Sequence, residues 1–475
     1  MPTMSRMRTT LLAAGALLLS PPLAAQTIEN VAKALGAAQV ETIEITGSGF
    51  FFALGQSIRP GIAWPRANLT RYTRVVDYAK GGISTDLTIT QGEDPPRGGG
   101  GQPFMGFQRR GSGGLGDQAW IMAYPAGTAT QTGVAQAQHD LWTTPHGIVR
   151  AALADKVAME GRTFTVTRAG RFKARAHVNA QNLIDKVESW LPNPVLGDMA
   201  VVTEYGDYKA FGAAMVPTRI AQSAGGFPVL AMGITDVKVN AGGVTPPAAI
   251  QPAAINVQID QAAPGVWFVH GGTHHSVVVE MKDHLILFEA PLGDARTNAV
   301  IDTVKRSLPA KPIRYAVNTH HHFDHSGGVR AAAAAGITIV THAINKPFFE
   351  AAYQNPHTFA PDALARAGKK AAFMTLTDKR VFSDGARTFE LYWLKDNLHN
   401  EGLIVGYLPK EKILMVADAF SPRAPIVKTP EQLNPFTTNL WAELERLKLD
   451  VQTVLPIHGR MVKVDELKIE VGRTQ

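Results

Sequence analysis

The segment that most limits how this chain can fold is Asn318–Gly328, which reads Asn-Thr-His-His-His-Phe-Asp-His-Ser-Gly-Gly. It contains the pattern His-x-His-x-Asp-His, formed by His320, His322, Asp324 and His325. The apolar run Ile313–Val317 before it predicts a strand, and the alanine-rich run Ser326–Ala335 after it predicts a helix. The four polar side chains should therefore lie in a loop at the carboxyl end of a strand.

The spacing of these four residues suits metal binding. Residues two apart in an extended segment point the same way, so His320 and His322 can bind one metal together. Asp324 and His325 turn into the start of the helix and can serve a second metal close by. The chain has no cysteine, so the site must use imidazoles and carboxylates. These groups suit zinc, although iron and manganese use them too.

More candidate ligands stand in the second half of the chain, which holds twelve of the fifteen histidines. Three further residues follow strand-like runs: His399 lies between Glu390–Leu394 and Leu403–Leu408, Asp418 ends Ile413–Val416, and His458 ends Val454–Ile457. A centre with two metals needs about this number of additional ligands, so these residues complete a candidate site.

Residues Val266 to His458 resemble the metallo-β-lactamase superfamily, because His-x-His-x-Asp-His, His, Asp and His follow one another in the same order. The resemblance implies an α+β protein with a C-terminal αββα metallo-β-lactamase sandwich. It also implies a first metal held by His320, His322 and His399, a second held by Asp324, His325 and His458, and a bridging Asp418. Two features depart from common forms of the family: His399 lacks Gly-His-Thr-Pro-Gly surroundings, and Ala417 replaces the glycine that commonly precedes the bridging aspartate.

The activity that this resemblance implies is that of a zinc-dependent hydrolase, in which two Zn²⁺ ions activate a hydroxide. Asp324 would be the catalytic residue that orients the hydroxide and relays its proton. The bridging aspartate is similar to that of the lactonase and glyoxalase II branches. The expected substrate is therefore a small-molecule ester, lactone, thioester or amide, and β-lactams belong to this set.

Two alternatives stay open at this point. One is a sulfur-dioxygenase-like enzyme that uses a single iron on the first group of histidines. The other is a carrier of apolar ligands whose metal domain is inactive. The complete set of seven candidate ligands argues against the carrier, because a decayed site should have lost at least one of them.

The other histidines carry weaker patterns. His274 and His275 lie in a short loop between two expected strands, where a surface position is favoured over a substrate contact. His342 is expected to be structural, and His321 to lie outside the metal shell. No role is assigned to His139, His146, His177, His284 and His357.

The first half of the chain shows the alternation of half-buried strands and no short catalytic motif. Strands are expected around Glu41–Ile45, Tyr72–Tyr78 and Asp86–Thr90. Helices are expected at Thr27–Leu35, Pro145–Ala154 and Asn179–Ser189, and a flexible loop at the glycine-rich run Gly111–Gly116.

A short helix followed by many amphipathic strands resembles the outer-membrane lipoprotein carrier family, most clearly in the closing run from Tyr205 to Asn240. The resemblance implies a β-rich half-barrel-like domain with an apolar concave face. Such a domain either binds an apolar ligand or has a structural or dimerising role.

The length of 475 residues predicts more than one domain. The run Ala241–Ala254 is rich in Ala, Pro and Gly and has no periodicity, which is typical of a linker. We therefore expect a lipoprotein-carrier-like domain at residues 26–240, a linker at 241–258 and the catalytic domain at 259–475.

Residues 1–25 have the composition of a secretion signal peptide. Arg6 and Arg8 precede the apolar run Leu11–Leu19, and small residues suited to cleavage follow. This run is shorter than the roughly 20 residues that a membrane span needs. We expect an exported mature protein, periplasmic or secreted, that begins near Gln26 and has no membrane span.

The charge of the chain argues against a nucleic-acid partner. The formal net charge is +7, and two of those charges belong to the expected signal peptide. No cluster of Lys and Arg with interleaved aromatic residues is found in the sequence. The partner is expected to be a small molecule, apolar if the first domain binds it, and the oligomeric state stays open.

Overall fold

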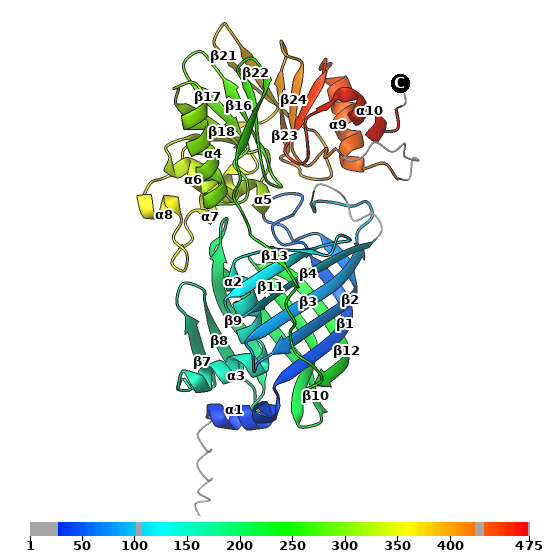
Figure 1. The fold of residues 1–475 in the computed structure, drawn as a ribbon, viewed down its shortest axis with the longest axis vertical. Coiled ribbons are helices and arrows are strands. Elements are labelled where there is room, and N and C mark those ends of the chain that lie inside the picture. The colour runs from blue at the N-terminus through cyan, green and yellow to red at the C-terminus, as the bar shows by residue number, and fades with distance from the viewer. Residues whose placement is uncertain (1–26, 101–106, 423–431, 474–475) are drawn as a thin grey trace, which may run out of the picture.

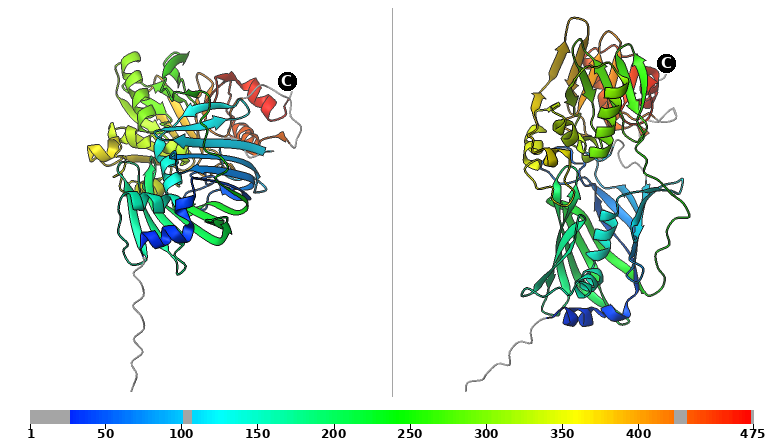
Figure 2. Two further views of the ribbon diagram at one scale, coloured as in Figure 1. Left: turned by 60° about the horizontal axis from the view of Figure 1, so that its bottom comes forward. Right: turned by 60° about the vertical axis from the view of Figure 1, so that its left-hand side comes forward.

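A computed structural model describes residues 27–100, 107–422 and 432–473, and the expected signal peptide at 1–25 lies outside these residues. The chain forms two lobes stacked along the long axis of the molecule (Figures 1 and 2). We call the part up to β13 the N-terminal lobe and the part from β14 on the C-terminal lobe. A single extended segment runs along the outside of the molecule between them.

The N-terminal lobe is built on one large, strongly curved sheet (Figure 2). Within the described residues it has thirteen strands in the order β13-β6-β5-β4-β3-β2-β1-β12-β11-β10-β9-β8-β7, so β13 and β7 form its edges. The strands are β1 Thr42–Phe52, β2 Arg66–Asp77, β3 Gly82–Gln91, β4 Phe107–Leu115, β5 Gln118–Ala123, β6 Thr128–Gln131, β7 Thr163–Arg168, β8 Phe172–Val178, β9 Ile184–Asn193, β10 Gly197–Phe211, β11 Ala214–Ala224, β12 Phe227–Val239 and β13 Ile250–Gln251.

Short helices fill the concave side and one end of this sheet. α1 begins after Thr27, whose side chain accepts a hydrogen bond from the Asn30 amide and caps the helix. α2 contacts β3, β4 and β9, which belong to both arms of the curved sheet, so it lies between the arms. The lobe is therefore β-rich, as predicted, and its likeness to lipoprotein carriers stays a prediction. The helices are α1 Ile28–Leu35, η1 Ala37–Gln39, α2 Val134–Trp142 and α3 Pro145–Ala154.

Two expectations for this lobe were wrong. The run Gly111–Gly116 lies mostly in strand β4 and not in a loop. The glycines are used for close packing: a Cβ on Gly113 would lie 2.6 Å from the ring of Trp120, and one on Gly114 would lie 2.6 Å from the Ala137 side chain in α2. Absence of side chains here lets a ring and a helix lie directly on the sheet.

The second error concerns Asn179–Ser189, where a helix was expected. Strand β9 begins at Ile184, and Val187, Ser189 and Leu191 are buried at alternate positions along it. This period of two is the period of a strand. One of these buried residues, Ser189, is polar and shares a hydrogen bond of 2.8 Å with His139. The alternation of buried and less buried residues therefore does not appear as an alternation of apolar and polar residues in the sequence.

The C-terminal lobe contains two sheets. Their strand orders are β14-β15-β16-β17-β18-β19-β20 and β21-β22-β23-β24-β25-β26. The strands are β14 Gln258–Ala263, β15 Val266–His270, β16 Ser276–Glu280, β17 Leu285–Phe288, β18 Ile313–Val317, β19 Thr338–His342, β20 Phe373–Leu376, β21 Lys379–Ser383, β22 Thr388–Trp393, β23 Ile404–Leu408, β24 Ile413–Val416, β25 Thr453–Pro456 and β26 Val462–Lys463. The helices are α4 Asp294–Ser307, α5 Phe323–Ser326, α6 Val329–Ala334, α7 Lys346–Ala352, α8 Ala363–Ala367, α9 Pro435–Arg446 and α10 Val464–Glu470.

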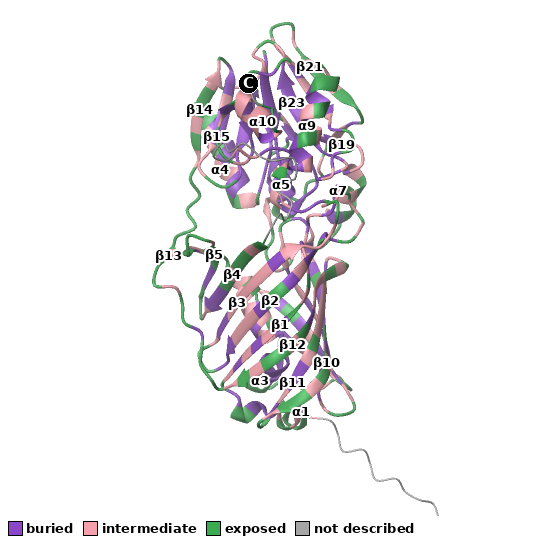
Figure 3. Cartoon of the chain, turned by 90° about the vertical axis from the view of Figure 1, so that its right-hand side faces the viewer, coloured by how far each residue is buried: buried purple, intermediate pink, exposed green. Residues whose placement is uncertain are grey.

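These elements form four layers, because side chains at alternate positions of a strand face opposite sides of the sheet. Val277 and Val279 of β16 face the second sheet, in a core shared with Phe389 and Leu391 of β22. Val278, between them, faces the opposite way, into a core shared with helices α4 and α6. α9 and α10 pack on the second sheet. Buried residues are concentrated between the layers (Figure 3), and the order helix, sheet, sheet, helix confirms the predicted αββα sandwich.

The described residues contain no helix with the length and apolar character that a membrane crossing requires.

Candidate metal centre

The candidate ligands are gathered where strands of the two sheets end. β17, β18 and β19 are parallel neighbours in the first sheet, and β24 and β25 are parallel neighbours in the second. Parallel strands present their carboxyl ends at one edge, which is where open α/β sheets commonly bind ligands. The residues found just past these ends are Glu289 after β17, His320 after β18, Asp418 after β24 and His458 after β25.

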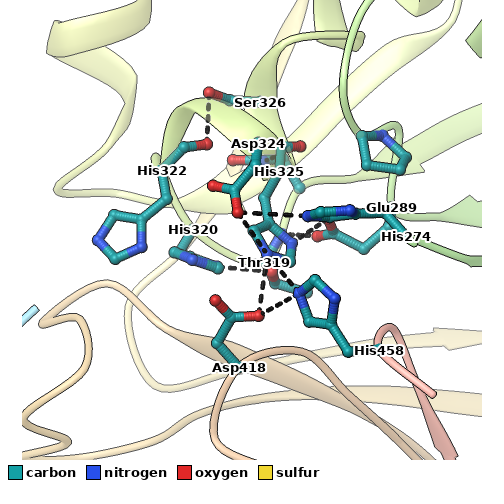
Figure 4. A network of polar contacts seen from close by, with 12 residues as sticks. His274, Glu289, Thr319, His320, His322, Asp324, His325, Ser326, Asp418 and His458 are labelled. Atoms are coloured by element: carbon teal, nitrogen blue, oxygen red, sulfur yellow. Dashed lines mark hydrogen bonds and ion pairs between the residues drawn. The ribbon is translucent and has the colours of Figure 1, made fainter. Parts of the chain in front are cut away.

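The structure brings all seven predicted ligands together in two adjoining groups, and Figure 4 labels all of them except His399. In each group the ligand atoms lie within 4.8 Å of one another. The buried cluster consists of His320, His322, His399 and Asp418, and the partly open cluster consists of Asp324, His325, His458 and His274. The first group has no exposed surface, whereas the Asp324 side chain is 29% exposed and that of His458 is 21% exposed. Access from solvent is therefore on the side of the partly open cluster.

Asp418 lies between the two clusters. Its Oδ2 is 3.3 Å from Nε2 of His399 in the buried cluster. Its Oδ1 is 2.9 Å from Nε2 of His325 and 2.8 Å from Nε2 of His458, both in the partly open cluster. This is the placement that the bridging role requires, since each carboxylate oxygen faces a different group of imidazoles.

Hydrogen bonds fix which nitrogen each imidazole turns toward the centre. Nδ1 of His320 bonds to the hydroxyl of Thr319 at 2.9 Å, and Nδ1 of His458 donates to the carbonyl of Thr273 at 3.0 Å. In both rings Nε2 is then free to face inward. An outer hydrogen bond of this kind sets the tautomer and raises the basicity of a metal-bound imidazole.

Glu289 performs the same task for His325 and was not identified from the sequence. Its carboxylate is fully buried, accepts the Nδ1 hydrogen of His325 at 2.9 Å and accepts the backbone N–H of Thr319 at 2.6 Å. One side chain thus orients a candidate ligand and the backbone of the His320 loop. The signal was present, because an acidic residue that directly follows an apolar strand is unusual.

His274 was also underestimated. The favoured surface position is wrong, because His274 is only 8% exposed and its Nε2 lies 3.2 Å from Oδ2 of Asp324. Its ring centroid lies 4.2 Å from that of His458. His274 is thus a fourth candidate ligand, or a polar contact for substrate, on the partly open side.

Neighbouring histidines are structural. His275 bonds to the carbonyl of Gly459 at 2.7 Å. His342 bonds to the carbonyl of Thr377 at 2.9 Å and stacks on Trp393, in agreement with its expected structural role. His321 turns away from both clusters, and its Nε2 lies 3.1 Å from the Ser57 hydroxyl in the other lobe.

Burial and neighbouring charges shift the pKa values of the imidazoles and carboxylates in the centre. Burial lowers the pKa of His322 to about 4 and that of His399 to about 3, so both rings are neutral at pH 7. Burial also disfavours the charged form of His325, but the carboxylates of Asp418 and Asp324 raise its pKa well above the usual value. Burial would raise the pKa of Asp418, yet His325 and His458 hold it well below its ordinary range.

The donor set fits divalent metal ions. Nδ1 of His322 is buried and accepts no hydrogen bond from the described residues, and both oxygens of the buried Asp418 carboxylate face imidazole nitrogens. The Nε2 atoms of His320 and His399 lie 3.1 Å apart, an arrangement of neutral imidazoles with inward lone pairs that suits a shared cation. Buried polar atoms of this kind are rare unless something binds them. Imidazole and carboxylate donors without thiolate are the ligands of catalytic zinc and of related metals.

Two residues of the N-terminal lobe also reach the centre. The loop between β1 and β2 crosses into the C-terminal lobe beside α5 (Figure 1). The side-chain amide of Gln56 donates to Oδ1 of Asp324 at 2.8 Å, and the carbonyl of Ser57 accepts the Nε2 hydrogen of His322 at 2.8 Å. No local pattern in the sequence pointed to either residue.

Comparison with known proteins identifies the same part of the chain. A sequence model described as the metallo-beta-lactamase superfamily matches residues 269–458, which contain all seven predicted ligands. A solved metallo-beta-lactamase from Pontibacter korlensis is similar at 21% identity and a TM-score of 0.36, over 46% of this chain and 97% of that one. A metallo-beta-lactamase from Hirschia baltica is similar at 19% identity and a TM-score of 0.35, over 46% of this chain and 99% of that one. Rubredoxin oxygen:oxidoreductase from Desulfovibrio gigas is similar at 16% identity and a TM-score of 0.36, over 45% of this chain and 61% of that one.

Proposed function

Because the domain at residues 269–458 belongs to the metallo-β-lactamase superfamily, we propose that this metal-dependent hydrolase holds two zinc ions and cleaves an ester, lactone, thioester or amide bond. The first ion would be held by His320, His322 and His399, the second by Asp324, His325 and His458, and Asp418 would bridge them. A β-lactam belongs to the same substrate class, and membership of the fold does not select it.

The observation that carries this proposal is the position of Asp418 between two complete groups of donors. Each group offers at least three protein ligands, and each of the two oxygens of Asp418 faces one group. An enzyme that needs one metal would have no use for a second donor group in contact with the first. This favours a dinuclear hydrolase over the mononuclear dioxygenase alternative.

Two divalent ions held in this way supply a water of much lowered pKa and an electrophile for the substrate oxygen. The chain's own contribution is orientation and proton transfer. Asp324 is ionised, because the charge of His325 and the hydrogen bond from His274 outweigh the effect of burial and lower its pKa. Its carboxylate stands on the exposed side of the centre, where it can orient the attacking water and accept a proton from it.

The metal content of the full chain tests this proposal. Protein purified without chelator is expected to contain about two zinc ions per chain, because the two donor groups share one bridging carboxylate. Elemental analysis measures this directly, and chromogenic ester, lactone, thioester and β-lactam substrates assayed on the same sample identify the bond that is cleaved. One tightly bound iron and no zinc would reject the proposal in favour of the dioxygenase. Two zinc ions without turnover of any substrate would reject the hydrolase.

The substrate that we propose is a small molecule with an apolar part. The concave side of the N-terminal lobe has a cavity of about 60 Å³, and its wall includes the apolar residues Ile43, Ile45, Val76 and Leu230. The same lobe contacts the metal centre through the β1–β2 loop. The substrate set should therefore include short- and long-chain members of each class, and a preference for long chains supports the apolar substrate.

We also propose that the protein is exported and acts in a periplasm or outside the cell. The support is the sequence of residues 1–25, which combines a basic start, an apolar run and small residues near Ala25. N-terminal sequencing of protein from the native host is expected to give a start near Gln26. A soluble cytoplasmic pool that retains Met1 would contradict export.

A further inference from the structure

We propose that the loop between β1 and β2 of the N-terminal lobe is part of the metal centre, and that Gln56 is the positioning residue that aligns Asp324 with the second metal. The inference rests on the proposed function only in that the partly open cluster binds a metal. It makes the two lobes a single functional unit, although the predicted metal ligands all belong to the C-terminal lobe.

The two oxygens of the Asp324 carboxylate face different lobes. Its Oδ2 faces the cluster, 3.2 Å from Nε2 of His274 and 3.9 Å from Nε2 of His325. Its Oδ1 faces the other lobe and accepts a hydrogen bond of 2.8 Å from Nε2 of Gln56. A carboxylate that binds a metal through one oxygen is held in place by a donor on the other, so Gln56 occupies the position of an outer-shell partner.

The next residue of the loop, Ser57, orients His322, a candidate ligand of the buried cluster. The carbonyl of Ser57 accepts the Nε2 hydrogen of His322 at 2.8 Å, and Ser57 itself is only 1% exposed. The hydrogen bond places the proton of His322 on Nε2 and leaves Nδ1 to face the cluster, where it has no other partner in the described residues. Consecutive residues of one loop thus orient one ligand from each cluster.

The loop is fixed by backbone hydrogen bonds between the lobes, so its position is not a chance contact of two side chains. The N–H of Phe323 donates to the carbonyl of Gly55 at 3.2 Å, and the N–H of Glu401 donates to the carbonyl of Ile58 at 2.7 Å. The loop therefore lies between the motif that begins at His320 and the segment that carries His399. It joins the two segments that supply the three imidazoles of the buried cluster.

Gly55 shows how closely the lobes approach. Its φ is +76°, in the left-handed region that favours glycine, and a Cβ there would lie 2.3 Å from Cγ of Phe323. Phe323 stands within the His-x-His-x-Asp-His motif, and its ring also packs edge to face on Trp64, with ring centroids 5.7 Å apart. Any side chain at position 55 would push the loop away from the motif.

The test is a pair of matched variants of the full-length protein. Gln56→Met keeps the approximate length of the side chain and removes the donor to Asp324. Gln136→Met is the control, because Gln136 donates to Asp140 over the same 2.8 Å but stands in α2, in the N-terminal lobe, away from the centre. Zinc affinity is measured by competition with chelators, and the electronic spectrum of the cobalt-substituted protein reports the geometry of each metal site.

Gln56→Met is expected to lower the affinity for the second metal ion by roughly 10–100-fold, the range for loss of a residue that hydrogen-bonds to a metal ligand. The affinity for the first ion should stay within about twofold of the wild-type value. Gln136→Met should leave both affinities unchanged. If Gln56 had a merely structural role, its substitution would lower the affinities for both ions equally or would change neither. Equal affinities for Gln56→Met and the wild type at both sites would overturn the inference.

Gly55→Ala is a second variant that moves the loop without removing a hydrogen-bonding side chain. This variant is expected to bind both metal ions more weakly, because displacement of the loop breaks the hydrogen bonds of Gln56 to Asp324 and of Ser57 to His322. Thermal unfolding of the metal-free variant shows whether the fold is kept, and a folded variant with wild-type affinities would also overturn the inference. Failure of the hydrolase proposal is a separate result, since metal affinity is measured without any substrate.

Discussion

The Asp324→Asn variant is expected to keep its fold and to lose roughly 10²–10⁴-fold of the wild-type turnover, the range for loss of a general acid or base. Asparagine has nearly the same shape, so the contact with Gln56 can be re-formed around the amide. It cannot accept a proton from the attacking water and is a poor metal ligand. Loss of the second metal would add to the fall in turnover. Steady-state kinetics together with elemental analysis separate the two contributions.

The matched control is Asp283→Asn. Asp283 pairs with Arg314 at 3.0 Å, its side chain is 62% exposed, and it stands at the end of β17 opposite to Glu289. Turnover of this variant should stay within about twofold of the wild type, as expected for an exposed ion pair. Near-normal turnover of Asp324→Asn with a full complement of metal would remove Asp324 from the proton transfer.

The Asp418→Asn variant is expected to lose both metal ions and with them all measurable turnover. Asp418 is fully buried and contacts imidazoles of both clusters, whereas Asp324, the other predicted carboxylate ligand, belongs to the partly open cluster. An amide offers one neutral oxygen in place of two charged ones and cannot serve two cations. Elemental analysis after dialysis is the measurement, with metal-free unfolding curves to show that the variant is folded.

Asp450→Asn is the corresponding control, because Asp450 is exposed, pairs with Lys412 and lies at the far ends of β24 and β25. It should retain two metal ions. If Asp418→Asn also retained two ions with wild-type affinity, the bridging role would be wrong and the two clusters would have to bind their metals independently.

The sequence predicted the C-terminal lobe well because its signals are local. The strand Ile313–Val317 and the helix that begins near Asp294 have the periods of their structures, and the ligand motif is short and continuous. Ligands that stand at the ends of apolar strands, such as Asp418 and His458, can be found because a charged residue interrupts a buried run.

The N-terminal lobe was predicted less well, for the opposite reason. Strand β4 contains Gly111, Gly113 and Gly114, which in isolation predict a loop. They are placed in a strand because Trp120 and Ala137 pack directly against the backbone there. Packing of this kind depends on residues that are distant in the sequence, and no local pattern reports it.

The same distinction holds within the metal centre. By itself the sequence predicted the seven candidate ligands and their order, because metal binding demands particular side chains at particular spacings. The resemblance to the metallo-β-lactamase superfamily implied their division between two metals. The tertiary structure alone decided which side chains orient those ligands. Glu289 reaches His325 across neighbouring strands, and Gln56 reaches Asp324 from a different lobe, 268 residues away along the chain. An orienting contact requires only one hydrogen-bonding group at the right place in space, so almost any polar residue can supply it. The position of Glu289 directly after an apolar strand is unusual, but it does not say which ligand Glu289 orients, and nothing local in the sequence marks Gln56.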